Sequence, residues 1–225
     1  SRDGQEILFI SNRGRIHGTG GFWRIKVEPG AEPREIHYEE TNWKARPDFS
    51  PDGKRIVYAS YLGQSWHQLW LMPANGGDVF AISYGSYDNI NPRWSPDGKQ
   101  IAFISNRNGN TSLWTQTIPG GAQTELKSQQ RKYMKPMGRL TVKVLGPDGN
   151  PTAARVFLTA DDGRSYAPAD GWMHADDNFE RKLGRFEPHY FQTQGTSELD
   201  VPVGSVQIGV MKGFEYAFDQ QKVEV

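Results

Sequence analysis

The stretch that decides the fold runs from Trp94 to Trp114 and reads WSPDGKQIAFISNRNGNTSLW. Residues 95–98, Ser-Pro-Asp-Gly, form a tight turn, because proline presets φ, aspartate bonds the backbone after it and glycine accepts a positive φ. The apolar run Ile101–Ile104 leaves this turn as a strand expected to be buried on both faces. Asn-Arg-Asn-Gly then predicts a second turn and a further strand. The stretch therefore indicates antiparallel strands joined by short turns.

This phrase occurs three times in the chain. SRDGQEILFISNRG begins at Ser1, SPDGKRIVYASYLG at Ser50 and SPDGKQIAFISNRN at Ser95, so the copies are offset by 49 and 45 residues. Four antiparallel strands in about 45 residues, the last one polar, predict a propeller blade. We assign the repeated residues to the architecture: Ser50, Pro51, Asp52, Gly53 and Trp70, then Ser95, Pro96, Asp97, Gly98 and Trp114, with Trp23 in the first copy.

The first copy is incomplete, because the strand that should precede Ser1 is missing and Arg2 replaces the turn proline. A closed propeller normally has four to eight blades, so three do not complete a ring. We therefore expect further blades upstream in a longer parent, or self-association that covers open sheet edges. The 25 Gly, 14 Pro, 7 Trp, 9 Tyr and 11 Phe also favour short strands and turns, and hence an all-β chain.

The blade pattern over residues 1–130 resembles the repeats of TolB-like (WD-type) β-propellers, a group also found in prolyl-oligopeptidase-type proteins. The resemblance implies a binding scaffold, a gate or an interaction platform, because propellers of this type carry many functions.

A second region follows a basic linker at residues 131–138. Residues 139–225 alternate apolar and polar positions, and RLTVKVLGPDGNPTAARVFLT predicts a hairpin of a small β-sandwich. This region resembles the immunoglobulin, transthyretin or carboxypeptidase-regulatory kind of sandwich. The predicted fold is all-β: a partial propeller of about three four-stranded blades at residues 1–130, the first one incomplete, and a sandwich at residues 139–225.

The run from Gly171 to Phe218 resembles the segment before the catalytic domain of CehA/McbA-type metal-dependent hydrolases, which are related to amidohydrolase and PHP domains. The resemblance implies a secreted or periplasmic parent whose hydrolase domain follows residue 225. It also implies a divalent metal such as zinc in that parent and no cofactor in this fragment. The partners would be the remaining blades and the downstream hydrolase domain.

The composition restricts the other partners. Lys plus Arg equals Asp plus Glu at 26 each, which disfavours nucleic acid. The chain has no cysteine, so disulfides and thiolate chemistry are excluded, and no apolar run is long enough to span a membrane.

The loop at residues 170–191 holds the densest group of polar side chains. The candidate cation ligands in it are His174, Asp176, Asp177 and His189. Their spacing matches no helical ligand pattern, so a structural loop or an interdomain contact is the favoured interpretation. Three tryptophans outside the repeat register, Trp43, Trp66 and Trp172, are candidate binding platforms.

No catalytic residue is predicted. The Gly-x-Ser-x-Gly elbow is absent, and Ser65 near His67 has no evident acid partner. His17, His37 and His67 occupy unlike positions in their copies and are read as ordinary polar residues. The expected function is a noncatalytic accessory part of a secreted metal-dependent hydrolase. The alternatives are a TolB-like periplasmic binding protein without enzymatic activity and the propeller part of a prolyl-oligopeptidase-type peptidase.

Overall fold

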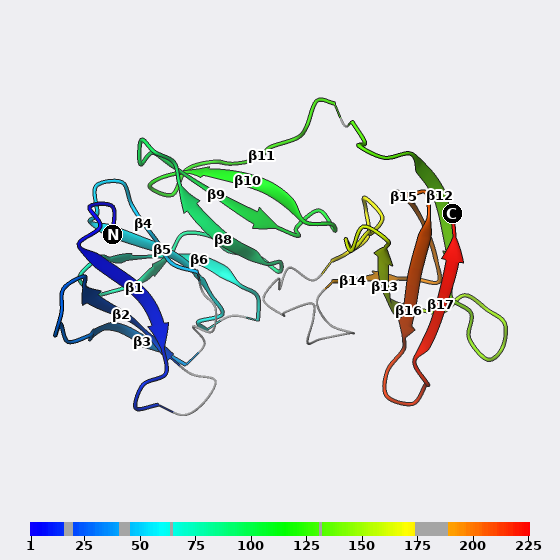
Figure 1. Ribbon diagram of the computed structural model, residues 1–225, viewed down its shortest axis with the longest axis horizontal. Coiled ribbons are helices and arrows are strands. Elements are labelled where there is room, and N and C mark those ends of the chain that lie inside the picture. The colour runs from blue at the N-terminus through cyan, green and yellow to red at the C-terminus, as the bar shows by residue number, and fades with distance from the viewer. Residues whose placement is uncertain (16–19, 41–45, 64, 131, 174–188) are drawn as a thin grey trace. The chain divides into compact units, whose positions relative to one another are not determined.

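The computed structural model describes the chain except residues 16–19, 41–45, 64, 131 and 174–188 (Figure 1). The described residues divide into two compact units, Ser1–Ser105 with Ser112–Lys127 and Asn106–Thr111 with Ser128–Val225. Every regular element among them is a β-strand, which confirms the all-β prediction. No helix in the described residues is long and apolar enough to cross a membrane.

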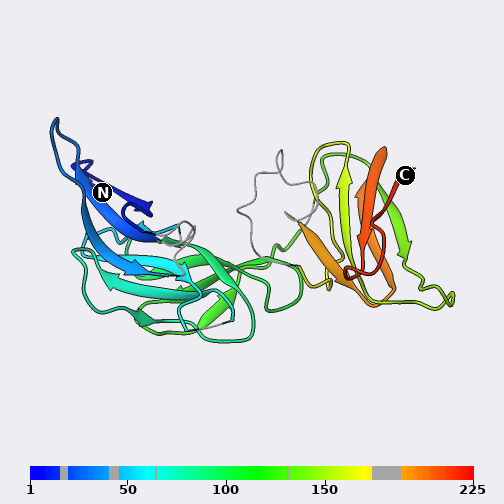
Figure 2. The ribbon, with the colours of Figure 1, turned by 90° about the horizontal axis from the view of Figure 1, so that it is seen from below.

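The first unit contains three consecutive antiparallel sheets (Figures 1 and 2). Blade 1 consists of β1 (Glu6–Ser11), β2 (Gly20–Lys26) and β3 (Arg34–Glu39). Blade 2 consists of β4 (Asp48–Phe49), β5 (Arg55–Ser60), β6 (Gln68–Pro73) and β7 (Phe80–Ala81), and blade 3 of β8 (Asn89–Trp94), β9 (Gln100–Ser105), β10 (Ser112–Thr117) and β11 (Gln123–Glu125). Each sheet is a simple meander, and blade 1 has three strands where blades 2 and 3 have four. The predicted partial propeller with an incomplete first blade is confirmed.

In blades 2 and 3 the Ser-Pro-Asp-Gly turn joins the first strand to the second, and hydrogen bonds to its aspartate stabilise it. Asp97 Oδ1 accepts hydrogen bonds from Ser95 Oγ at 2.6 Å and from Lys99 N at 3.0 Å. The Gly98 N–H donates to the Ser95 carbonyl at 3.0 Å, and Gly98 has a φ of 70°. Asp52 in blade 2 makes the same two kinds of bond. The hydrogen bond from the serine hydroxyl lowers the pKa of both aspartates below its ordinary value, with a smaller contribution from the backbone N–H.

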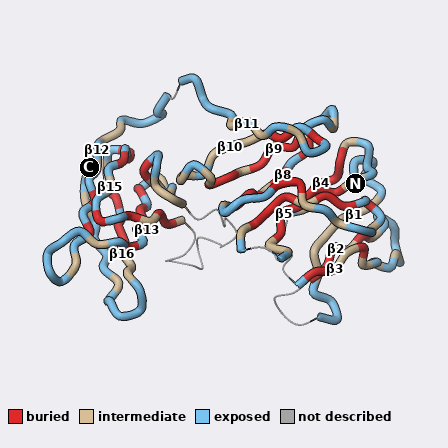
Figure 3. Tube along the Cα trace, turned by 180° about the vertical axis from the view of Figure 1, so that it is seen from behind, coloured by how far each residue is buried: buried red, intermediate tan, exposed pale blue. Residues whose placement is uncertain are grey.

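The middle blade is packed on both faces. In β5 every residue after the half-buried Arg55 is buried, and Ile56, Val57 and Tyr58 are each 0% exposed (Figure 3). In β9 only alternate residues are fully buried, namely Ile101 and Phe103, whereas Ala102 and Ile104 are half-buried. The expected burial on both faces therefore holds for the strand in blade 2 and not for its equivalent in blade 3. Blade 3 has a neighbouring blade on one side only within the described chain.

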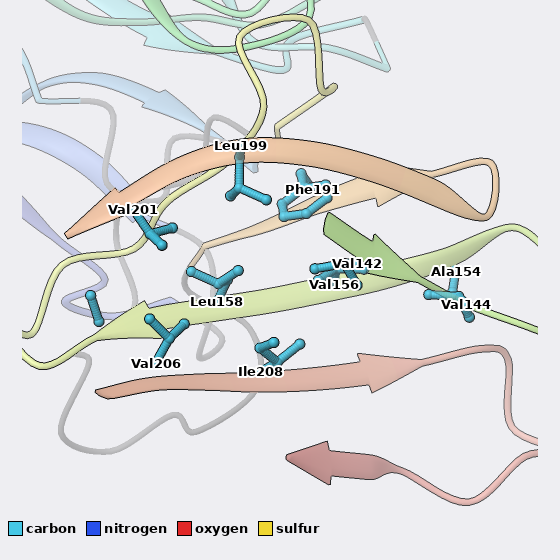
Figure 4. Packing of buried hydrophobic residues seen from close by; sticks show 11 residues of the cluster. Val142, Val144, Ala154, Val156, Leu158, Phe191, Leu199, Val201, Val206 and Ile208 are labelled. Atoms are coloured by element: carbon cyan, nitrogen blue, oxygen red, sulfur yellow. The ribbon is translucent and has the colours of Figure 1, made fainter. Parts of the chain in front are cut away.

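The second unit contains two sheets that enclose one apolar core (Figure 4). One sheet pairs β12 (Met137–Lys143) with β15 (Thr196–Pro202). The other has the order β14 (Tyr190–Thr193), β13 (Ala154–Ala160), β16 (Ser205–Met211) and β17 (Asp219–Glu224). Val142 and Leu199 of the first sheet share the core with Val156, Leu158 and Phe191 of the second.

One local prediction in this unit is wrong. The alternation over residues 140–158 predicts a hairpin, but β12 pairs with β15 while β13 pairs with β14 and β16. The Gly-Pro-Asp-Gly-Asn turn is present, since Gly146 N donates to Asn150 O at 2.8 Å. It lies in a connection that carries the chain from one sheet to the other. An arch and a hairpin both place alternate residues toward the core, so the pattern alone does not distinguish them.

Candidate functional site

Two loops of blade 2 emerge at the same end of its sheet. In an antiparallel meander the connection between β5 and β6 and the one that leaves β7 lie opposite the Ser-Pro-Asp-Gly turn. These connections contain residues 61–67 and 82–88. Loops held at one end of a rigid sheet are common positions for binding residues. We define this end of blade 2, with its two loops, as the loop face.

A buried histidine and aspartate join the two loops. The backbone N–H of His67 donates to Asp88 Oδ1 at 3.1 Å, and its Nδ1 lies 3.3 Å from the same oxygen. The imidazole also stacks on Tyr61, with ring centroids 3.7 Å apart. Asp88 is 1% exposed and His67 is 8% exposed. The pair thus fixes one loop against the other. Within the described part of the chain, no serine hydroxyl forms a hydrogen bond with the His67 imidazole.

The glutamine after this histidine organises the second loop. Gln68 Nε2 donates to the carbonyls of Gly85 at 3.1 Å and Tyr87 at 3.0 Å. Its Oε1 accepts from Ser83 Oγ at 2.9 Å and from Asn89 Nδ2 at 3.1 Å. Gln68 and Asn89 are fully buried, so these bonds form in a region of low dielectric constant. A satisfied buried network of this kind gives the loop a defined conformation.

The loop carries two tyrosines, Tyr84 exposed and Tyr87 half-buried, whose hydroxyls are already bonded. Tyr84 is 68% exposed, and its hydroxyl donates to Ala81 O at 3.1 Å. The Tyr87 hydroxyl donates to Tyr84 O at 2.9 Å. The Tyr87 ring lies over Gly85, where any Cβ would collide with it. The arrangement presents ring surface in a fixed orientation, which suits contact with a peptide or another partner at a low entropic cost.

A second buried polar cluster lies between blades 1 and 2. Glu39 of β3 accepts hydrogen bonds from the Tyr58 hydroxyl at 3.3 Å and from the Ser60 hydroxyl of β5. His37 Nε2 lies 3.1 Å from the same carboxylate. Burial raises the pKa of Tyr58, and the neighbouring Glu39 charge raises it further. A phenol kept neutral in this way is suited to donate to the carboxylate, so the cluster links two blades.

The candidate residues from the sequence lie in different places. Trp66 is half-buried on the loop face. Trp172 is half-buried in the second unit, where its carbonyl accepts from Gln192 N at 3.0 Å, and His189 is half-buried just before β14. The remaining candidates, Trp43, His174, Asp176 and Asp177, lie outside the described residues, as does His17. In the described residues, no three His, Cys, Asp or Glu side chains are grouped to hold a metal ion.

The tryptophans of the repeat lie near the blade interfaces. Trp70 packs against the core between blades 1 and 2, and Trp114 against the core between blades 2 and 3. Trp23 is half-buried and donates from Nε1 to Ser11 O at 3.2 Å.

Sequence reasoning missed Gln68, Ser83 and the role of Asp88. Their signal in the sequence is weak, because most of their hydrogen-bond partners are 14 to 21 residues distant. Only the position of Asp88 and Asn89 at the start of the inner strand of blade 3 marks them as structurally constrained.

The fold and the loop face together define a β-propeller with ordered loops at one end of its middle blade. The family described as PD40, TolB β-propeller domain, matches residues 31–145, which is half of the chain. The chain belongs to this family of TolB β-propeller domains.

Two curated relatives share the repeat region. The uncharacterized peptidase YuxL of Bacillus subtilis (strain 168) is 30% identical over 118 residues, which are 50% of this chain and 17% of the relative. The uncharacterized protein Atu1656 of Agrobacterium fabrum is 30% identical over 106 residues, 47% of this chain and 34% of the relative. The matched segment thus spans at most about a third of these relatives.

One solved structure shares the fold. TolB from Acinetobacter baumannii superposes with a TM-score of 0.50 and 15% identity over 93% of this chain and 49% of that chain. At this identity the likeness concerns the fold alone.

Proposed function

We propose that the chain is a noncatalytic binding module of the TolB type, which holds an extended peptide segment of a partner protein on the propeller. The observation that carries this proposal is the loop face of blade 2. There a buried network centred on Gln68 fixes a loop that exposes the ring of Tyr84 beside the half-buried ring of Tyr87. Rigid, amphipathic tyrosine rings are effective peptide contacts, because few rotors are immobilised on binding.

The absence of catalysis is part of the proposal. Two of the described histidines make structural contacts: His67 bonds Asp88 and stacks on Tyr61, and His37 bonds the buried Glu39. A general base needs an accessible partner that carries the proton to be removed. These two imidazoles are each directed at a carboxylate inside the fold, which supports a binding role over a hydrolytic one.

A second candidate is the propeller portion of a peptidase. The match to peptidase YuxL favours it, since the aligned segment covers only 17% of that relative. In this case a larger protein would carry an α/β-hydrolase domain beside the blades. The resemblance to CehA/McbA-type hydrolases instead requires a metal domain after residue 225, and neither curated relative described above has a name that indicates such an enzyme. Export to the periplasm and a zinc ion in the parent protein are further proposals, and they depend on which of these kinds of protein the parent is.

Selection from a random peptide library tests the binding role. Peptides selected on the 225-residue chain are synthesised with a fluorophore, and their affinity is measured by polarisation. Tyr84→Ala should weaken binding by about tenfold, which corresponds to about 1.4 kcal/mol of lost aromatic contact. Phe214→Ala is the matched control, because Phe214 is a fully exposed aromatic of the other unit.

Two results would contradict the proposal. One is a selected peptide whose affinity falls with Phe214→Ala and not with Tyr84→Ala, because the second unit would then be the binding surface. The other is hydrolysis of a chromogenic aminoacyl substrate by the purified chain. The coding sequence on either side decides the larger context: Gly-x-Ser-x-Gly near the blades indicates a peptidase, and a His-x-His metal motif after residue 225 indicates a metallohydrolase.

A further inference from the structure

An apolar groove lies between the two sheets of the second unit, where β12 faces β16 and β17. Its walls are formed by Leu140 and Val144 of β12 and by Ile208, Val210 and Val223 of β16 and β17. The groove has a volume of about 450 Å³, and all of its lining residues belong to the second unit. Small-molecule sites have volumes of roughly 300 to 1,000 Å³ and mostly apolar walls. The groove therefore has the size and the lining of a ligand site.

The groove follows from the unequal widths of the two sheets. The sheet of β12 and β15 has two strands, whereas the sheet opposite it has four. Val206 and Ile208 of β16 point into the space between the sheets (Figure 4), and Val210 follows them on the same face because side chains alternate along a strand. Val206 is 0% exposed, Ile208 is 9% exposed and Val210 is half-buried. Burial thus decreases along β16, and the groove leads from the solvent to the apolar core.

Contacts between the two sheets mark both ends of the groove. At one end Val225 bonds Gly204 through its N–H and its carbonyl. Its side chain lies against Gly138 at the start of β12, where any Cβ would collide with it. At the other end Lys212, the residue after β16, reaches across and donates a hydrogen bond to the Thr152 hydroxyl. The first contact is apolar and the second is polar, so the two ends of the groove differ in chemistry.

The ammonium group of Lys212 supplies a positive charge at the polar end. Besides the bond to Thr152, its Nζ lies 5.0 Å from the centroid of the Tyr216 ring. Both partners are neutral, and no carboxylate of the described residues forms an ion pair with Lys212. The hydroxyl and the ring therefore position the ammonium group without neutralising it. The charged residues of the whole lining are Lys143, Lys212 and Asp219, which leaves one net positive charge.

The β17 wall changes from apolar to polar in the same direction. Asp219 and Gln221 pair with Val210 and Ile208 across the sheet, so their side chains lie on the groove side. Gln221 Nε2 donates to Asp219 Oδ2 at 3.3 Å, so this carboxylate already has a neutral partner. Val223, two residues further along β17, is apolar and half-buried. The groove therefore matches an amphipathic ligand with an apolar chain and a polar head.

We propose that this groove binds a medium-chain fatty acid, with the alkyl chain along β12 and the carboxylate at Lys212. From Leu140 to Val144 the strand covers about 13 Å, at about 3.3 Å per residue. An extended alkyl chain advances about 1.25 Å per bond, given C–C bonds of about 1.5 Å, so about ten carbons have this length. Burial of the chain supplies affinity. The charge-assisted bond to Lys212 selects a carboxylate over an uncharged head.

Isothermal titration calorimetry of the 225-residue chain with decanoate tests the site. The decanoate is kept below the concentration at which it forms micelles, and one molecule per chain should bind with a dissociation constant in the micromolar range. Decanol and decyltrimethylammonium have the same alkyl chain with a neutral and a positive head. Each should bind at least about tenfold more weakly than decanoate, because neither forms the ion pair with Lys212.

Two pairs of variants test the head and the chain separately. Lys212→Met removes the charge and should weaken decanoate about tenfold while decanol binds as before. Lys222→Met is the matched control, because Lys222 pairs with Gln207 on the opposite face of the sheet. Val210→Trp fills the groove and should abolish the binding of both ligands. Gln207→Trp places the same ring on the outer face of β16 and should leave binding unchanged, and circular dichroism verifies the fold of every variant.

Three outcomes would overturn the proposal. The first is no heat of binding with decanoate at millimolar concentration. The second is equal binding of decanoate and decanol that Lys212→Met does not change, or stronger binding of decyltrimethylammonium, since the carboxylate would then not be recognised. The third is an equal loss of affinity in Gln207→Trp and Val210→Trp. The groove and the loop face belong to different units, so Tyr84→Ala should leave decanoate binding unchanged, and either proposal can fail without the other.

Discussion

Each of the three repeat copies has an isoleucine at the equivalent position, so substitutions at these positions compare how strongly packing between blades stabilises each strand. Replacing Ile7, Ile56 or Ile101 by alanine removes the same three carbon atoms from equivalent strands. Ile56 and Ile101 are 0% exposed and Ile7 is 52% exposed. Three buried methyl or methylene groups contribute about 2.4 kcal/mol, and the cavity left behind adds to this, so we expect losses of about 3 to 4 kcal/mol at positions 56 and 101.

At position 7 the loss should be much smaller. Half of the side chain is already in water and no closed cavity forms, so about 1 kcal/mol is expected. Unfolding in urea, followed by tryptophan fluorescence, measures the difference, since every tryptophan except Trp172 falls within the ranges of the first unit. With a slope near 2 kcal/mol/M, the midpoint should fall by about 1.5 to 2 M for the buried positions and about 0.5 M for Ile7.

A loss of stability at Ile7 equal to that at Ile56 would refute the reasoning, because a half-exposed isoleucine would then contribute as much to packing as a fully buried one.

Three further predictions concern other parts of the molecule. The hydrogen bond from the Ser95 hydroxyl is the main cause that lowers the pKa of Asp97 in the folded protein below its ordinary value of 3.8. The ionised Asp97 therefore adds to the free energy of unfolding above pH 3.8, and this contribution is lost as the pH falls through the pKa of the folded state. In Asp97→Asn the free energy of unfolding should therefore decrease less steeply as the pH falls below about 4. An acid-unfolding curve identical to that of the parent would contradict this. Gln68→Leu should cost about 3 kcal/mol, because buried polar partners lose their bonds, and should speed amide exchange at residues 83–89. Leu158→Ala should lower the unfolding midpoint of the second unit by the equivalent of about 3 kcal/mol, while the fluorescence transition of the first unit stays in place.

The blades were predictable because their determinants are local. A turn that needs proline, aspartate and glycine in order is specified by adjacent residues, and Asp97 bonds only Ser95 and Lys99. The repeat then supplies the number of blades, since the same phrase implies the same strand order. Blade 1 was predictable even with its inner strand missing, because the remaining strands keep the register.

The candidate site was less predictable because it depends on distant partners. Gln68 is an ordinary polar residue in the sequence, and it acquires its role only when residues 83–89 fold back onto it. The hairpin error has a similar cause, since alternation specifies the buried side of β12 and not the strand beside it. Pairing with β15 depends on a segment more than fifty residues away.

The proposed binding surface lies on blade 2. Its two faces are packed, so the buried network behind the loop face does not require a further blade to exclude water. Blades 1 and 3 each pack against one face of blade 2. A substitution such as Ile7→Ala should therefore leave the ordered loop at Tyr84 in place, because Ile7 takes part in none of the hydrogen bonds that order this loop.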